Sequence, residues 1–188
     1  MIEEAAGVGV NAFRAGSFGF NRNTLSALAE NNILFDSSYN ACMFGLDSEV
    51  LPDITVVDAF ECNGIFEYPM TVFNDGTRFL RPAQLTACSS NEMEGLLWQA
   101  LESGRKSFVI LSHNFELLNK AKNRPDYVVV KRFHSLCEFL DRNRDSFCVK
   151  GFNKLQPQFT QLQPPPLASP LWKTGARMLE QVYRRRYD

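Results

Sequence analysis

Apolar and polar positions along this chain alternate between strand-like and helix-like patterns through about residue 150. Short apolar runs predict strands at residues 10–14, 33–35, 54–57, 64–73, 108–111 and 147–149. Apolar positions at helical spacing predict helices at residues 22–30, 90–103 and 130–143. Strands that alternate with helices favour a parallel sheet, either open or barrel-like.

Polar and special residues mark the ends of these elements. Ser89 and Glu92 fit a capping box at the start of the helix at 90–103, and Gly104 is a natural stop behind it. Pro69 lies inside the predicted strand at 64–73, which predicts an edge strand or a bulge there.

The composition changes after about residue 152. Residues 156–170 are rich in Gln and Pro and are predicted to form a linker, because proline cannot continue a helix or a central strand. Residues 173–187 are predicted to form a helix. The sequence therefore predicts a globular domain at 1–152, with a Pro/Gln-rich linker and a helical tail at 153–188.

Composition narrows the classes of function. A net charge of −1 over 188 residues gives no field that would attract nucleic acid. No apolar run approaches ~20 residues, so no transmembrane segment is expected. The N-terminus lacks the pattern of a signal peptide, so a soluble chain is expected, and the compartment stays open. The five dispersed cysteines are expected to be reduced and show no zinc-site spacing.

Two predicted strands end on a chemically capable side chain. Arg14 ends the first, ahead of a small-residue bend, and its guanidinium could hold a carboxylate while backbone N–H groups of the bend stabilise an oxyanion. His113 follows the strand at 108–111, where an imidazole could serve as general acid or base. A surface arginine and a hydrogen-bonded strand-end histidine are the structural alternatives.

Asp36 also follows a predicted strand. With Ser37 and Ser38 it could equally form a turn that only closes the strand. The sequence contains no metal-binding motif of paired histidines, no phosphate-binding glycine loop and no nucleophile elbow.

Taken in order, these strings resemble the polysaccharide deacetylases (the NodB-like carbohydrate esterases). FRAGSFG, with Arg14, resembles the family's third motif, in which an arginine steadies the catalytic-base aspartate. FDSSYN, from Phe35 to Asn40, resembles the fourth motif. LSH, ending at His113, resembles the fifth, whose histidine is the general acid. The resemblance spans about residues 2–152.

The resemblance implies an incomplete (β/α) barrel that lacks its first strands. The family's first two motifs supply the base aspartate and the metal ligands, and both precede the third motif. Only 13 residues precede Arg14 here, so the chain is expected to be a fragment with a missing N-terminal segment. Tyr39 stands where the family has a second aspartate, which adjusts the pKa of the histidine. How the pKa of His113 would be set is therefore open.

The implied parent activity is a hydrolase reaction: metal-dependent removal of N-acetyl groups from a glycan, with a divalent metal such as zinc. By resemblance the catalytic residues are His113, Arg14 and Asp36, and the substrate-binding residues are Ser17, Phe18 and Tyr39. No metal ligand is assigned in this chain. We expect no cofactor, a glycan as partner, and no activity from this chain alone.

Three other interpretations stay open. A non-catalytic remnant could bind carbohydrate or a partner through groove aromatics such as Phe18, Phe20, Tyr39 and Tyr68. An interaction subunit could take its missing strands from another chain. The chain could also be an unrelated doubly wound α/β domain.

Overall fold

The computed structural model describes residues 7, 9–44, 50 and 54–187. The protein is mixed α/β with two small sheets, and its contacts divide it into two compact units. Unit 1 comprises Met1–Thr71 and Lys150–Pro165, and unit 2 comprises Val72–Val149 and Pro166–Asp188. Among the described residues neither sheet closes into a barrel, so the incomplete deacetylase-type barrel stays a prediction.

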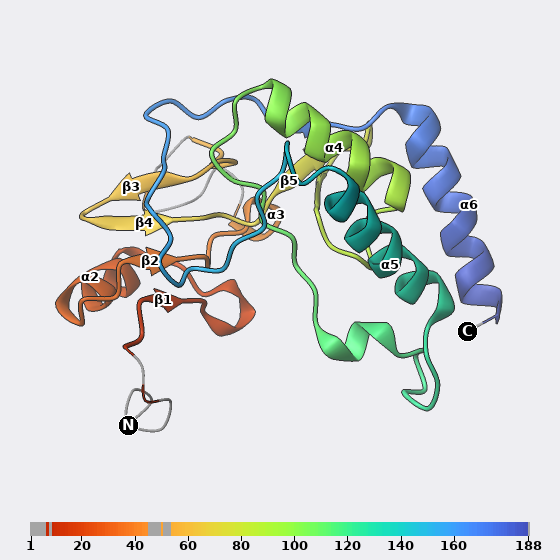
Figure 1. Cartoon of the computed structure of the whole chain (residues 1–188), viewed down its shortest axis with the longest axis horizontal. Helices are drawn as coiled ribbons and strands as arrows, with labels where there is room; N and C mark the ends of the chain where they lie inside the picture. Colours follow the sequence, from red (N-terminus) through yellow and green to blue (C-terminus); the bar gives the residue numbers. More distant parts are fainter. Residues whose placement is uncertain (1–6, 8, 45–49, 51–53, 188) are drawn as a thin grey trace. The chain divides into compact units, whose positions relative to one another are not determined.

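Unit 1 holds a four-stranded sheet in the order β1-β2-β4-β3, with β1, β2 and β4 parallel and β3 antiparallel to β4. Its elements, drawn from red to yellow in Figure 1, are β1 (Ala12–Phe13), the 3₁₀ turn η1 (Gly16–Phe18), α2 (Arg22–Glu30), β2 (Phe35–Asp36), α3 (Ala41–Phe44), β3 (Phe60–Cys62) and β4 (Ile65–Glu67). The Asn21 side chain caps α2 by accepting from the Thr24 N–H at 2.9 Å.

The core of unit 1 is built around an aromatic side chain of β2. Phe35 is 2% exposed and lies beside the rings of Phe66, Tyr68 and Phe152, at centroid distances of 5.5 to 6.2 Å. Phe152 comes from the segment after residue 149, which therefore belongs to this core. Gln163 of the same segment accepts from the Val57 N–H at 2.9 Å.

Unit 2 holds a three-stranded sheet in the order β6-β5-β7. Its elements are β5 (Val72–Asn74), β6 (Leu80–Pro82), α4 (Ser90–Glu102), the 3₁₀ turn η2 (Asn114–Leu117), α5 (Tyr127–Arg142), β7 (Leu167–Ala168) and α6 (Leu171–Tyr187). Helix α4 begins with the predicted capping box of Ser89 and Glu92. Helix α5 begins at Asp126, whose carboxylate accepts from two backbone N–H groups.

Helices α4 and α5 share the apolar core of unit 2, and α6 is joined to them by charged contacts (green, teal and blue in Figure 1). Arg177 of α6 is 1% exposed and donates to Asp75 at 2.6 Å and to Glu92 at 3.0 Å. Both carboxylates are fully buried. Arg132 of α5 also pairs with Glu180 of α6 at 2.5 Å. Helix α6 is therefore an integral part of unit 2.

Acid is expected to weaken unit 2 through Asp75. Burial raises the pKa of Asp75, but hydrogen bonds from Thr77 and Arg81 outweigh it and lower the pKa to about 2. A carboxyl with a depressed pKa stabilises the fold above its unfolded pKa of about 3.9 and loses that contribution as pH falls. The loss is about 2.6 kcal/mol for a shift of this size.

The measurement is urea unfolding of wild type and Asp75→Asn between pH 7 and pH 2. The variant should be less stable at pH 7 and lose less stability over this range than wild type. Asp145→Asn, at an exposed position, is the matched control and should follow wild type. Parallel curves for wild type and Asp75→Asn would contradict the assignment.

The structure confirms the predicted helices better than the predicted strands. Helix α2 has the predicted bounds, and α4, α5 and α6 begin or end within three residues of theirs. The predicted strand at 64–73 is two strands, because Pro69 has no N–H and interrupts the ladder. The strands predicted at 54–57 and 147–149 are wrong, and the one at 108–111 is reduced to a single bridge at Leu111.

Candidate functional site

The parallel strands β1, β2 and β4 end at one edge of the unit 1 sheet. In parallel strands the carboxyl ends lie together, so the residues that follow them meet there. Arg14 follows β1, Ser37 follows β2 and Tyr68 follows β4. We call Arg14, Asp36, Ser37, Ser38 and Glu67 the strand-end cluster.

Arg14 contacts the chain that follows β2. Its Nε donates to the Ser37 carbonyl at 2.9 Å, and its Nη2 donates to the Ser37 hydroxyl at 2.7 Å. The Ser37 hydroxyl in turn donates to the Tyr68 carbonyl at 2.7 Å. Burial lowers the pKa of Arg14, and the charges of Glu67 and Asp36 oppose that shift. The third and fourth motifs of the resemblance thus lie in contact.

The bend after Arg14 is held by the other serine. The Ser38 hydroxyl accepts from the Ala15 N–H at 2.9 Å and donates to Asp36 Oδ1 at 2.5 Å. Within the bend, Ser17 and Phe18 have φ angles of 54° and 56°. This left-handed region is unfavourable for residues other than glycine, and such strain gathers at binding sites.

Asp36 is completely buried. Its Oδ1 accepts from the Ser37 N–H at 2.9 Å as well as from Ser38. Burial raises the pKa of Asp36 above its ordinary value, and this rise is opposed by its interaction with the neighbouring Glu67 and by the hydrogen bonds from Ser38 and Ser37. Asp36 therefore acts on its surroundings through Ser38 and Arg14.

Glu67 belongs to the strand-end cluster and was not predicted from the sequence. It is fully buried, and its Oε1 accepts from the Tyr39 N–H at 2.9 Å. Burial first, and then the charge of the adjacent Asp36, raise the pKa of Glu67 well above its ordinary value. The available signal in the sequence was a glutamate within the mostly apolar run at 64–73. A glutamate is rarely buried without a partner, so this position is unusual.

The predicted substrate-binding residues differ in exposure. Ser17 is exposed and Phe18 is half-buried on the bend. Tyr39 is fully buried, and its ring packs edge-on against Phe20 at 5.4 Å. Tyr68 is also buried, and its hydroxyl accepts from the Gln158 N–H at 3.0 Å. Only the bend therefore offers an accessible surface among these residues.

His113 belongs to unit 2, whereas Arg14 and Asp36 belong to unit 1. It is exposed, precedes η2 and stacks on Phe115 with ring centroids 5.0 Å apart. Leu111, two residues before it, forms the bridge to Gln84. An exposed imidazole at a chain bend is accessible to a ligand or a proton donor.

The resemblance implies a divalent metal, which would need a cluster of ligating side chains. Within the described ranges, no group of three or more His, Cys, Asp and Glu side chains is placed to hold a metal ion. In the strand-end cluster, Asp36 Oδ1 and Glu67 Oε1 already accept from backbone and hydroxyl donors, and the cluster contains no His or Cys side chain. These residues do not fit the family's metal, and we derive no step through it.

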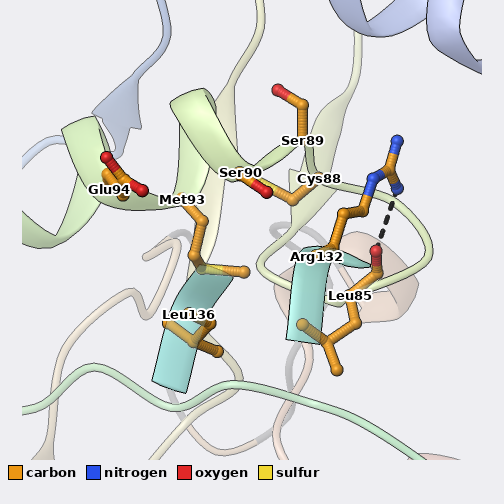
Figure 2. A pocket seen from close by; sticks show the side chains of 8 residues that line it. All are labelled: Leu85, Cys88, Ser89, Ser90, Met93, Glu94, Arg132 and Leu136. Atoms are coloured by element: carbon orange, nitrogen blue, oxygen red, sulfur yellow. Dashed lines mark hydrogen bonds between the residues drawn. The ribbon is translucent and has the colours of Figure 1, made fainter. Parts of the chain in front are cut away.

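The hollows found in unit 2 do not suggest a second site. Figure 2 shows a small one, with space for about one water molecule, where Arg132 donates to the Leu85 carbonyl at 2.9 Å beside Cys88 and Met93. A broader hollow of ≈ 740 Å³ has a basic lining. Two of its cations, Arg81 and Arg184, are already paired with buried carboxylates.

The comparisons with known proteins gave no relative. No family model, no curated protein and no solved structure matches this chain. Within the described part of the chain, no helix has the length and apolar character needed to span a membrane.

Proposed function

We propose that this chain is a polysaccharide deacetylase-like protein that binds a glycan at the strand-end cluster of unit 1. The observation that supports this most is the contact between Arg14 and Ser37, because it joins the two motifs of the resemblance that lie in unit 1. Arg14 keeps its Nη1 without a hydrogen bond to any described residue. A guanidinium N–H of this kind suits a sugar hydroxyl or an N-acetyl carbonyl.

The strained bend supports the same proposal. Ser17 offers an exposed hydroxyl and Phe18 an aromatic ring, which is the combination that sugar rings need for hydrogen bonding and stacking. Left-handed backbone at both residues costs free energy, and a ligand-binding role explains why it is kept.

The reaction implied by the resemblance is hydrolysis of an N-acetyl group, with His113 as general acid and Arg14 as the residue that orients the base. We propose this as the activity of the parent family and expect no acetate release from this chain alone. Acetate release from an N-acetylglucosamine oligomer, suppressed by a chelator, would contradict that expectation.

The binding test is calorimetric titration of the chain with an N-acetylglucosamine oligomer. Arg14→Ala should weaken binding about 10- to 100-fold, since a hydrogen bond to a charged group contributes about 1.5–3 kcal/mol. Arg22→Ala removes an exposed arginine of unit 1 and serves as the control. Equal affinity of wild type and Arg14→Ala would refute the proposed site.

The variant His113→Ala tests whether His113 contributes to glycan binding or whether the glycan binds to unit 1 alone. Unchanged glycan affinity supports a binding module that uses unit 1 alone. Weakened affinity in a folded variant supports a contribution of His113 to glycan binding. Circular dichroism of the variant confirms that the fold is kept.

A further inference from the structure

Asp36 and Glu67 lie directly opposite each other on neighbouring parallel strands. Their Cα atoms are partners in the register of β2 and β4, so both side chains leave the same face of the sheet. Both residues are 0% exposed. The preceding pair, Phe35 and Phe66, occupies the other face.

Each of the two carboxyl groups has one oxygen with a donor and one without. Asp36 Oδ1 accepts from Ser37 and Ser38, and Glu67 Oε1 accepts from the Tyr39 N–H. Asp36 Oδ2 and Glu67 Oε2 are buried and have no donor among the groups that the structure describes. A buried polar oxygen without a partner is costly, and two in adjacent side chains call for a common explanation.

The charges of the two carboxyl groups also need an explanation. Two ionised carboxylates side by side in a dry interior repel each other, and adjacent carboxyls relieve this by keeping one proton. The charged or titratable groups that act on the pair from neighbouring segments are the Arg14 guanidinium and the Tyr39 phenol. One retained proton leaves the pair with a single negative charge, which the single positive charge of Arg14 balances.

We propose that Glu67 and Asp36 share one proton at neutral pH through their Oε2 and Oδ2 atoms, and that Glu67 is thereby a positioning residue for the bend after Arg14. The proton resides on Glu67, because Asp36 has more donors to stabilise its charge. Glu67 donates to Asp36, Asp36 accepts from Ser38, and Ser38 accepts from the Ala15 N–H. This chain of hydrogen bonds connects β4 to the bend.

The proposal goes beyond glycan binding and does not depend on it. A carboxyl whose pKa is raised by burial and by its neighbour stabilises the fold below its unfolded pKa, about 4.3 for glutamate, and loses that contribution as pH rises. The bend that carries Ser17 and Phe18 should therefore loosen as pH rises, whereas unit 2 is weakened by acid through Asp75.

The direct test is isotope-edited infrared spectroscopy of the intact chain with ¹³C-labelled glutamate or aspartate side chains. At pH 7 wild type should show the C=O stretch of one protonated carboxyl in the glutamate-labelled sample. Glu67→Gln should lack it, and Glu30→Gln, an exposed control in unit 1, should retain it. Only ionised carboxylates at pH 7 in both labelled samples would overturn the proposal.

A second readout measures the positioning role. Glu67→Gln keeps the size of the side chain and replaces the shared proton with an amide N–H. As pH rises, the hydrogen-exchange rate of the Ala15 N–H should show a transition in wild type, beyond its ordinary increase with pH, that is absent in Glu67→Gln. The same transition in both proteins would overturn the role assigned to Glu67.

Discussion

Replacing Arg177 with alanine is expected to destabilise unit 2 by about 3–5 kcal/mol. The substitution leaves Asp75 and Glu92 as buried carboxylates that have lost a buried cation, 2.6 and 3.0 Å away in the wild type. Both tryptophans, Trp98 and Trp172, lie in unit 2. Urea unfolding followed by tryptophan fluorescence therefore reports on this unit.

Arg186→Ala is the matched control, because Arg186 is exposed on the same helix. Its free energy of unfolding should stay within about 0.5 kcal/mol of the wild-type value. Arg177→Lys, which keeps the charge but cannot make both contacts as a planar fork, should lie between the two. A wild-type midpoint for Arg177→Ala would contradict the importance of the buried network.

Replacing Phe35 with alanine should destabilise unit 1 by about 3–5 kcal/mol, the usual cost of removing a buried phenylalanine. Phe35 packs against Phe66 of β4 and Phe152 of the segment after residue 149. The substitution would leave a cavity and remove contacts between parts of unit 1 that are distant in sequence. Native-state hydrogen exchange of the Phe66 N–H, which donates to the Leu34 carbonyl, measures the loss.

Phe13→Ala on the neighbouring strand provides the control, since Phe13 is 39% exposed. Phe13→Ala should lower the free energy of unfolding far less than Phe35→Ala does. Similar losses for the two variants would show that Phe35 is not the centre of this core.

The helices were predictable because their signals are local. Helix α4 carries its capping box and apolar spacing within its own sequence, and α5 carries an apolar face and an aspartate cap. The strands depend on partners elsewhere in the chain. Phe108 and Ile110 pack against the core of unit 2 without joining a ladder, and the short β7 pairs with β5 across about 90 residues of sequence.

In the candidate site, the only residues that the sequence could predict are those that follow a predicted strand. Arg14 and Asp36 were predicted from that position, and the structure brings the segments after β1 and β2 together at one edge. Glu67 could not be assigned from sequence, because its partnership with Asp36 depends on the register of β2 and β4. The roles of Tyr39 and His113 stay predictions.

The proposed glycan site at the strand-end cluster is tested most directly by ¹⁵N NMR of the labelled chain titrated with an N-acetylglucosamine oligomer. The account predicts saturable shifts of the amides from Ala15 to Phe18 and of Ser37, and their loss in Arg14→Ala. Shifts confined to other residues, or no shifts at high oligomer concentration, would contradict it.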